Sequence, residues 1–181
     1  MLGETMETSF IAVINDPLNP IERTKEDGSP VLNKHGVKKT FTQSYKIEIS
    51  GDNAAQFLGR SIGDEVDGIY IGDGETTLSG YKLQITGGSD KTGTPMRADI
   101  DGGGRKSVLV HASTGFKGTV RVTKSKKGEK RVFRSKPAGM RKRRNFRGRI
   151  ITADTRQINL KVIEAGSIPL ERIMGSGDDA Q

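Results

Sequence analysis

The chain has 181 residues, which suits one domain, or one domain with extensions, because domains usually run to about 100 to 150 residues. It contains no cysteine and only two histidines, which excludes disulfides, thiolate nucleophiles and cysteine zinc sites and argues against a histidine metal cage. The start lacks a basic segment followed by an apolar run, and no stretch of about 18 apolar residues occurs. We therefore expect an untargeted, cytosolic chain with no membrane span.

Positive charge is concentrated in one segment. The formal net charge is +8. Residues 121–149 hold 14 of the 30 Lys and Arg residues and one of the 22 acidic residues, Glu129, which leaves the rest of the chain mildly acidic. Segregation of this kind is the electrostatic pattern expected of a protein that binds a polyanion.

Two strands and a helix are expected in the first third of the chain. Residues 9–15 are rich in β-branched and aromatic types and should form a strand that stops at Asp16-Pro17. Residues 18–39 are polar and interrupted by prolines and glycines, which predicts a long loop or insertion that adds little core. Residues 40–50 alternate apolar and polar side chains, as a half-buried strand does. A short helix should follow, capped by Asp52 or Asn53 and ended by Gly59 in the left-handed conformation. Its narrow apolar face consists of Ala54, Ala55, Phe57 and Leu58.

Further strands are expected from short apolar runs separated by Gly and Asp clusters. They are residues 66–71, 81–86, 106–111, 119–123, 149–152 and 157–163, with tight loops at 87–88 and 102–104. Ser167 is expected to cap a second short helix, and residues 175–181 to form a disordered tail. The spacing predicts a mainly β fold: a small antiparallel sheet or barrel with one or two short helices and basic extensions.

The strongest chemical feature is the run MRKRRNFRGR at residues 140–149. Its like charges repel one another, and a phosphate backbone relieves that repulsion while releasing condensed counterions. Arginine dominates the run, and its planar guanidinium grips phosphate bidentately and stacks on bases. Phe146 could stack on an unpaired base or anchor the segment in the core. For the run as a whole, the simpler alternative to RNA binding is a solvated charged face. The basic residues are Arg141, Lys142, Arg143, Arg144, Arg147 and Arg149.

A second basic group occupies residues 120–136. Lys127-Gly128-Glu129 is typical of a hairpin tip between two runs, VRVTK and KRVFR, that alternate charged and apolar residues. Such a hairpin could lie in or along an RNA groove, or could be an ordinary exposed hairpin that happens to be cationic. Its basic residues are Arg121, Lys124, Lys126, Lys127, Lys130, Arg131, Arg134 and Lys136.

Other motifs do not assemble into an active site. Residues 102–107 (GGGRKS) have the composition of a phosphate loop, but a Walker-type loop needs four residues between its glycines and a helix after it. A tight turn that presents Arg105 and Lys106 fits better. The acids within residues 64–67 suit a solvated turn, and His111 has no nucleophile elbow near it in the sequence. We therefore predict no catalytic residue, metal site, cofactor or small-molecule substrate.

Several blocks occur in a specific order along the chain. They are GDEVDG at 63–68, GYKLQITGGSDK at 80–91, PMR at 95–97, GMRKRR at 139–144, RG at 147–148 and QINLKV at 157–162. Together they resemble the archaeal and eukaryotic small-subunit ribosomal protein six family, which is distinct from the bacterial protein of the same number. The resemblance covers residues 41–166, and long ordered blocks are far more specific than a basic run.

The resemblance implies a mainly β protein in cytoplasmic ribosomes, buried against small-subunit ribosomal RNA and neighbouring ribosomal proteins. It also implies that the 86–97 loop, with Lys91 and Arg97, and the basic run at 141–149 face RNA. The chain is similar to archaeal members, because it lacks the long serine-bearing tail of eukaryotic ones. It departs from the family pattern in two insertions, at 18–39 and between residues 116 and 139, and in Thr94, where the family usually has an aromatic.

These observations predict a mainly β domain at residues 1–120, a basic RNA-binding hairpin and run at 121–149, and final strands at 150–174 that return to the β domain. The expected function is a structural constituent of the small ribosomal subunit that binds ribosomal RNA in translation. One alternative is a free RNA- or DNA-binding factor, such as an RNA chaperone or chromatin protein. The other is a phosphate-handling enzyme that uses the 102–107 loop.

Overall fold

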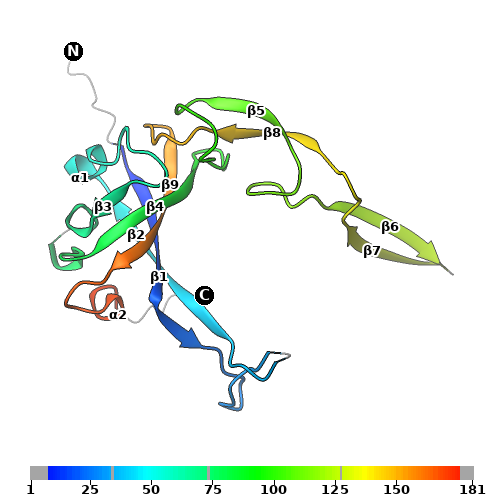
Figure 1. Ribbon diagram of the computed structural model, residues 1–181, viewed down its shortest axis with the longest axis horizontal. Helices are drawn as coiled ribbons and strands as arrows, with labels where there is room; N and C mark the ends of the chain where they lie inside the picture. Colours follow the sequence, from blue (N-terminus) through cyan, green and yellow to red (C-terminus); the bar gives the residue numbers. More distant parts are fainter. Residues whose placement is uncertain (1–7, 34, 73, 127, 176–181) are drawn as a thin grey trace.

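A five-stranded mixed sheet forms the body of the protein (Figure 1). The structure is a computed structural model that describes residues 8–33, 35–72, 74–126 and 128–175. The strand order is β2-β1-β9-β4-β3, with β1 parallel to β9 and the other neighbours antiparallel. The strands are β1 (Phe10–Glu22), β2 (Thr40–Ile49), β3 (Glu65–Asp67), β4 (Lys82–Asp90) and β9 (Thr155–Glu164). The mainly β prediction is confirmed.

One face of this sheet carries the main core. Alternate residues of the central strands point into it, because side chains alternate between the two faces of a strand. Two short helices, α1 (Gly51–Ala55) and α2 (Leu170–Ile173), pack on the same core through Ala54 and Leu170. The fully buried residues of β1 and β9 are Phe10, Ala12, Ile14, Ile158 and Leu160.

Two two-stranded ladders extend away from the body. The first, called the arm below, pairs β5 (Arg105–Val110) with β8 (Lys142–Arg147). The second is a hairpin of β6 (Val120–Lys126) and β7 (Glu129–Ser135), which lies at the far end of the molecule's long axis (Figure 1). A second, smaller core lies beside the arm and is made of Ile100, Val110, Phe116 and Phe146.

The first strand does not stop at Asp16-Pro17, so that prediction is wrong. β1 continues to Glu22, and its pairing with β2 is interrupted after Asp16 and resumes where Ile21 meets Phe41. Two prolines lie in the interruption, and a proline cannot donate a ladder hydrogen bond. Residues 18–22 therefore belong to β1, while the described part of residues 23–39 is the predicted loop, with two isolated bridges, Thr24–Pro30 and Leu32–Lys38. Their described side chains are exposed or half-buried, so they add little core, as expected.

The helices are shorter and capped differently than predicted. Ser50 is the N-cap of α1 and makes no side-chain capping bond, and Pro169, not Ser167, is the N-cap of α2. Of the four apolar residues expected to face the core, only Ala54 and Phe57 are buried. The expected left-handed Gly59 is confirmed, with φ of 82°. Residues 176–181 of the predicted tail lie outside the described residues.

Three further predictions are corrected. Gly87 and Gly88 are not a loop but part of β4, where Gly88 approaches β9 so closely that a Cβ would lie 2.4 Å from the Gln157 carbonyl oxygen. The strand expected at 66–71 is only β3, and Gly68–Tyr70 form a 3-10 turn. Residues 149–152 make an isolated bridge, while the basic run before them forms β8.

Candidate nucleic-acid interface

The basic run forms an edge of the arm. Arg143 lies opposite Leu109 and Arg144 opposite Val108 in the β5–β8 register. Directly opposed residues of an antiparallel pair share one face. The guanidinium carbon of Arg144 lies 5.5 Å from the centre of the Phe116 ring, so this charge rests on the small core. Lys142, Arg143 and Arg144 are all exposed, and the arm therefore presents a row of cations to solvent.

Phe146 is the anchor of that row. Its side chain is fully buried in the small core, and the Arg97 guanidinium lies 4.9 Å from the centre of its ring. Of the two interpretations left open by the sequence, the structure shows the core one. Burying a phenylalanine here fixes β8, and with it the direction of the neighbouring charges.

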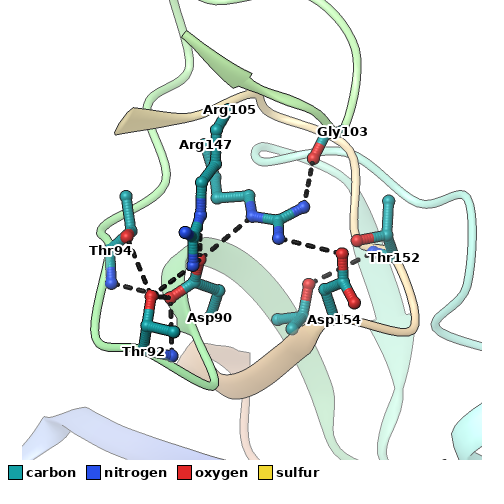
Figure 2. A network of polar contacts seen from close by, with 9 residues as sticks. Asp90, Thr92, Thr94, Gly103, Arg105, Arg147, Thr152 and Asp154 are labelled. Atoms are coloured by element: carbon teal, nitrogen blue, oxygen red, sulfur yellow. Dashed lines mark hydrogen bonds and ion pairs between the residues drawn. The ribbon is translucent and has the colours of Figure 1, made fainter. Parts of the chain in front are cut away.

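Asp90, at the end of β4, holds the base of the arm (Figure 2). Its Oδ2 accepts hydrogen bonds from Nε of Arg105, at 2.8 Å, and from Nε of Arg147, at 3.1 Å. Its Oδ1 accepts from the backbone N–H of Thr92, at 2.9 Å, and of Thr94, at 2.8 Å. Only 1% of the Asp90 side chain is exposed. One buried carboxylate thus ties both strands of the arm to the main sheet.

The charge of Asp90 is stabilised by these donors. Burial by itself would raise the pKa of the carboxyl, but the Thr94 N–H, the Arg105 guanidinium and further donors from Thr92 and Arg147 outweigh it. The pKa of Asp90 therefore lies far below its ordinary value, and the group stays ionised at neutral pH. Burial lowers the pKa of Arg147 and its bonds to Asp154 and Asp90 more than offset this, so that its pKa is raised.

Arg105 and Arg147 are directly opposed in the arm, so their charges would repel each other without a shared partner. Asp90 supplies that partner. Arg147 also donates to the Asp154 carboxylate at 2.9 Å and to the Gly103 carbonyl at 3.0 Å (Figure 2). Arg105 and Arg147, two members of the predicted RNA-binding set, are thus paired with acceptors of the protein itself.

The hairpin presents opposed like charges as well. Arg121 lies opposite Arg134, and Lys124 opposite Arg131. All four side chains are exposed, as are Lys130 and Lys136. The side chains of Lys126 and Lys127 lie outside the described residues. The predicted hairpin at 120–136 is confirmed, and it carries its cations on both faces.

The remaining predicted residues lie around the junction of sheet and arm. Arg97 forms an ion pair with Asp99 at 2.6 Å, and Arg149 pairs with Asp101 at 3.2 Å. Lys106 is exposed and donates from Nζ to the Asp101 carbonyl at 3.3 Å. Lys91 and Arg141 are exposed. That these groups contact RNA stays a prediction.

Two contributors to this region were not singled out from the sequence. Asp90 lies within one of the family blocks, and the signal that could have found it is the pattern Asp-Lys-Thr-Gly, which is typical of a turn in which an aspartate side chain accepts from the N–H two residues on. The opposition of Arg121 and Arg134 depends on hairpin register, which the charge count alone does not give.

The 102–107 segment has no phosphate-loop geometry. Gly102 has φ of 87°, and the chain enters β5 at Arg105, a strand and not a helix. The carbonyl of Gly103 is occupied by Arg147. Among the described residues, no group of three or more His, Cys, Asp or Glu could hold a metal ion, and no helix is long and apolar enough to cross a membrane.

Fold and charge together define a class: a small, mainly β protein whose positive charge lies on extensions outside its core, as in proteins that bind nucleic acid. Comparison with known proteins identifies the family within this class. The family model described as Ribosomal protein S6e matches residues 36–132 and 118–175. The chain therefore belongs to the S6e ribosomal protein family, which is not an enzyme family.

Relatives from several organisms carry the name small ribosomal subunit protein eS6. The protein of Haloarcula marismortui is 38% identical over 136 residues, covering 75% of this chain and 88% of its own length. That of Thermoplasma acidophilum is 39% identical over 129 residues, 71% of this chain and 86% of its own. That of Methanothermobacter thermautotrophicus is 38% identical over 137 residues, 76% of this chain and 91% of its own. Each aligned region is a smaller share of this chain than of the relative, so this chain is the longer.

The family model matches the chain in two parts. The first match to the family model begins at residue 36, near the end of the extended part of the β1–β2 hairpin. The two matches overlap at residues 118–132, within which β6 lies and β7 begins. The β6–β7 hairpin therefore lies where the two matches meet, and that it is an insertion relative to the family stays a prediction.

Proposed function

We propose that this chain is a structural constituent of the small ribosomal subunit in cytoplasmic ribosomes and that it binds ribosomal RNA through the arm and the hairpin. The names of its relatives support the place of assembly. The body of the protein holds the arm, and the arm and hairpin supply the contacts. Neighbouring ribosomal proteins are its other partners.

The observation that carries the proposal is the exposed row at residues 142–144 next to the hairpin's opposed cations. Like charges directly opposed on a ladder destabilise it. A hairpin of two strands is itself only marginally stable in water. A phosphate backbone lying against these strands removes both problems, because it neutralises the cations and releases its condensed counterions.

The test measures how RNA binding depends on salt. The logarithm of the association constant should fall with the logarithm of salt concentration, by about 0.7 to 0.9 per neutralised phosphate. Replacing Arg141, Arg143 and Arg144 by Ala should flatten that slope by about 2 to 3 units. The matched control replaces Lys25, Lys46 and Lys161, exposed cations outside the arm and the hairpin, by Ala and should leave the slope unchanged.

Sedimentation of cell lysate separates this function from a free RNA- or DNA-binding factor. We expect nearly all of the protein in small-subunit fractions, including after a high-salt wash. A protein found mainly in the light fractions would refute the structural role while leaving RNA binding intact. An unchanged slope in the arm variant would refute the placement of the interface.

A further inference from the structure

Phe133 is an aromatic side chain that stays exposed inside the basic segment. The residue is 40% exposed, whereas Phe146, the other aromatic of residues 121–149, is fully buried. It lies on β7 opposite Val122 of β6, in the hairpin that projects away from both cores (Figure 1). An exposed aromatic ring beside cations offers the two groups that bind single-stranded nucleic acid, a stacking surface for a base and positive charge for the backbone.

The same face of the hairpin carries cations. Side chains two residues apart on a strand share a face, so Lys124 and Arg131 lie on the side of Phe133. Lys124 Nζ lies 5.3 Å from the centre of the Phe133 ring. The face therefore combines a flat aromatic surface with an ammonium group on a flexible stem.

The other face of the hairpin carries two opposed arginines. Arg121 and Arg134 are directly opposed there, as Arg105 and Arg147 are in the arm. In the arm Asp90 forms an ion pair with both arginines, and Asp154 forms another with Arg147. For Arg121 and Arg134, the described part of the chain provides no hydrogen bond or ion pair, so both guanidinium groups are open to an anion from a partner.

We propose that the hairpin binds an unpaired segment of RNA, with a base stacked on Phe133, its phosphate held by Lys124, and a further phosphate held between Arg121 and Arg134. This rests on the proposed function and adds the form of the RNA. Bases within an A-form duplex stack on one another and its major groove is too deep and narrow for side chains to read, whereas single strands and bulges offer free base faces. Lys124 can leave the ring for the phosphate of the nucleotide whose base replaces it.

The test uses the full chain and two RNA probes. One is a single strand of about 12 nucleotides, within the usual range of site sizes, with 2-aminopurine at its centre, and the other is the duplex of the same sequence. The key variant is Phe133→Leu, which keeps an apolar side chain on the strand but removes the flat ring. Phe133→Tyr keeps the ring, and Val132→Ala changes an exposed residue on the opposite face.

Phe133→Leu should weaken binding to the single strand by roughly 5- to 100-fold, as the loss of one base–aromatic stack does, with an unchanged salt slope. The fluorescence change of 2-aminopurine on binding should shrink with it. Phe133→Tyr and Val132→Ala should bind as the original protein does. Binding to the duplex should be weaker and insensitive to the change.

Two results overturn the inference alone. One is Phe133→Leu binding the single strand as tightly as the original protein, and the other is an equal loss on both probes. If the original protein binds neither probe, the proposed function fails and the inference with it. The original protein is therefore measured first, which keeps the two failures apart.

Discussion

Replacing Asp90 by Asn tests whether one buried carboxylate fixes the arm to the body. The substitution keeps the shape of the side chain and its acceptor for the N–H groups of Thr92 and Thr94. It removes the negative charge that Arg105 and Arg147 share, and it turns an amide group with two donors toward guanidinium groups that can only donate.

The magnitude follows from what each arginine retains. Removing one partner of a buried ion pair costs about 3 to 5 kcal/mol, because the other charge is left uncompensated. Arg147 keeps Asp154 and the Gly103 carbonyl, and Arg105, 44% exposed, can turn toward water. We therefore expect a loss of about 2 to 4 kcal/mol of unfolding free energy, or roughly 5 to 15 °C in melting temperature for a chain of this size.

The assay is urea unfolding at neutral pH, followed by circular dichroism. The control is Asp101→Asn, whose side chain is 83% exposed and pairs with Arg149 on the surface, and it should change stability by no more than about 0.5 kcal/mol. If Asp90→Asn is as stable as the original protein, the clamp does not hold the arm.

Three further changes probe the same fold. Gly88→Ala should lower the free energy of unfolding by about 1 to 3 kcal/mol in a melting experiment, because its Cβ would lie 2.4 Å from the Gln157 carbonyl oxygen. Gly87→Ala, whose Cβ meets nothing within 4 Å, should be tolerated, and equal losses in the two variants would contradict this. Phe146→Ala should lower the free energy of unfolding by about 3 to 5 kcal/mol, because it removes one of the two aromatic side chains of the small core. A loss below about 0.5 kcal/mol, less than an Ile→Val change usually costs, would show that this core adds little stability. The pKa of Asp90 is lower in the folded chain than its ordinary value of about 3.9, so its contribution to the free energy of unfolding is complete above about pH 4 and is lost as pH falls further. Unfolding measured against pH should show this acid loss of stability in the original protein and less of it in Asp90→Asn. Identical profiles would exclude Asp90 as its source.

Much of the fold could be predicted because its signals are local. The alternation in residues 40–50 and 157–163 specifies half-buried strands, and both form. The hairpin at 120–136 follows from a Gly turn between two alternating runs. The basic run was found from charge alone, but not its strand, because a row of arginines has no apolar periodicity until β5 is beside it.

By itself, the amino-acid order determined the fold class, the ordered family blocks and the place where positive charge gathers, since each of these depends on residues close together in the chain. Tertiary structure alone decided which cations face outward. In the folded chain Phe146 is buried, Arg105 and Arg147 form ion pairs with Asp90, and Phe133 is exposed to solvent. The reason is physical: burial and ion pairing depend on partners tens of residues apart, and strand register, not spacing in the sequence, brings them together.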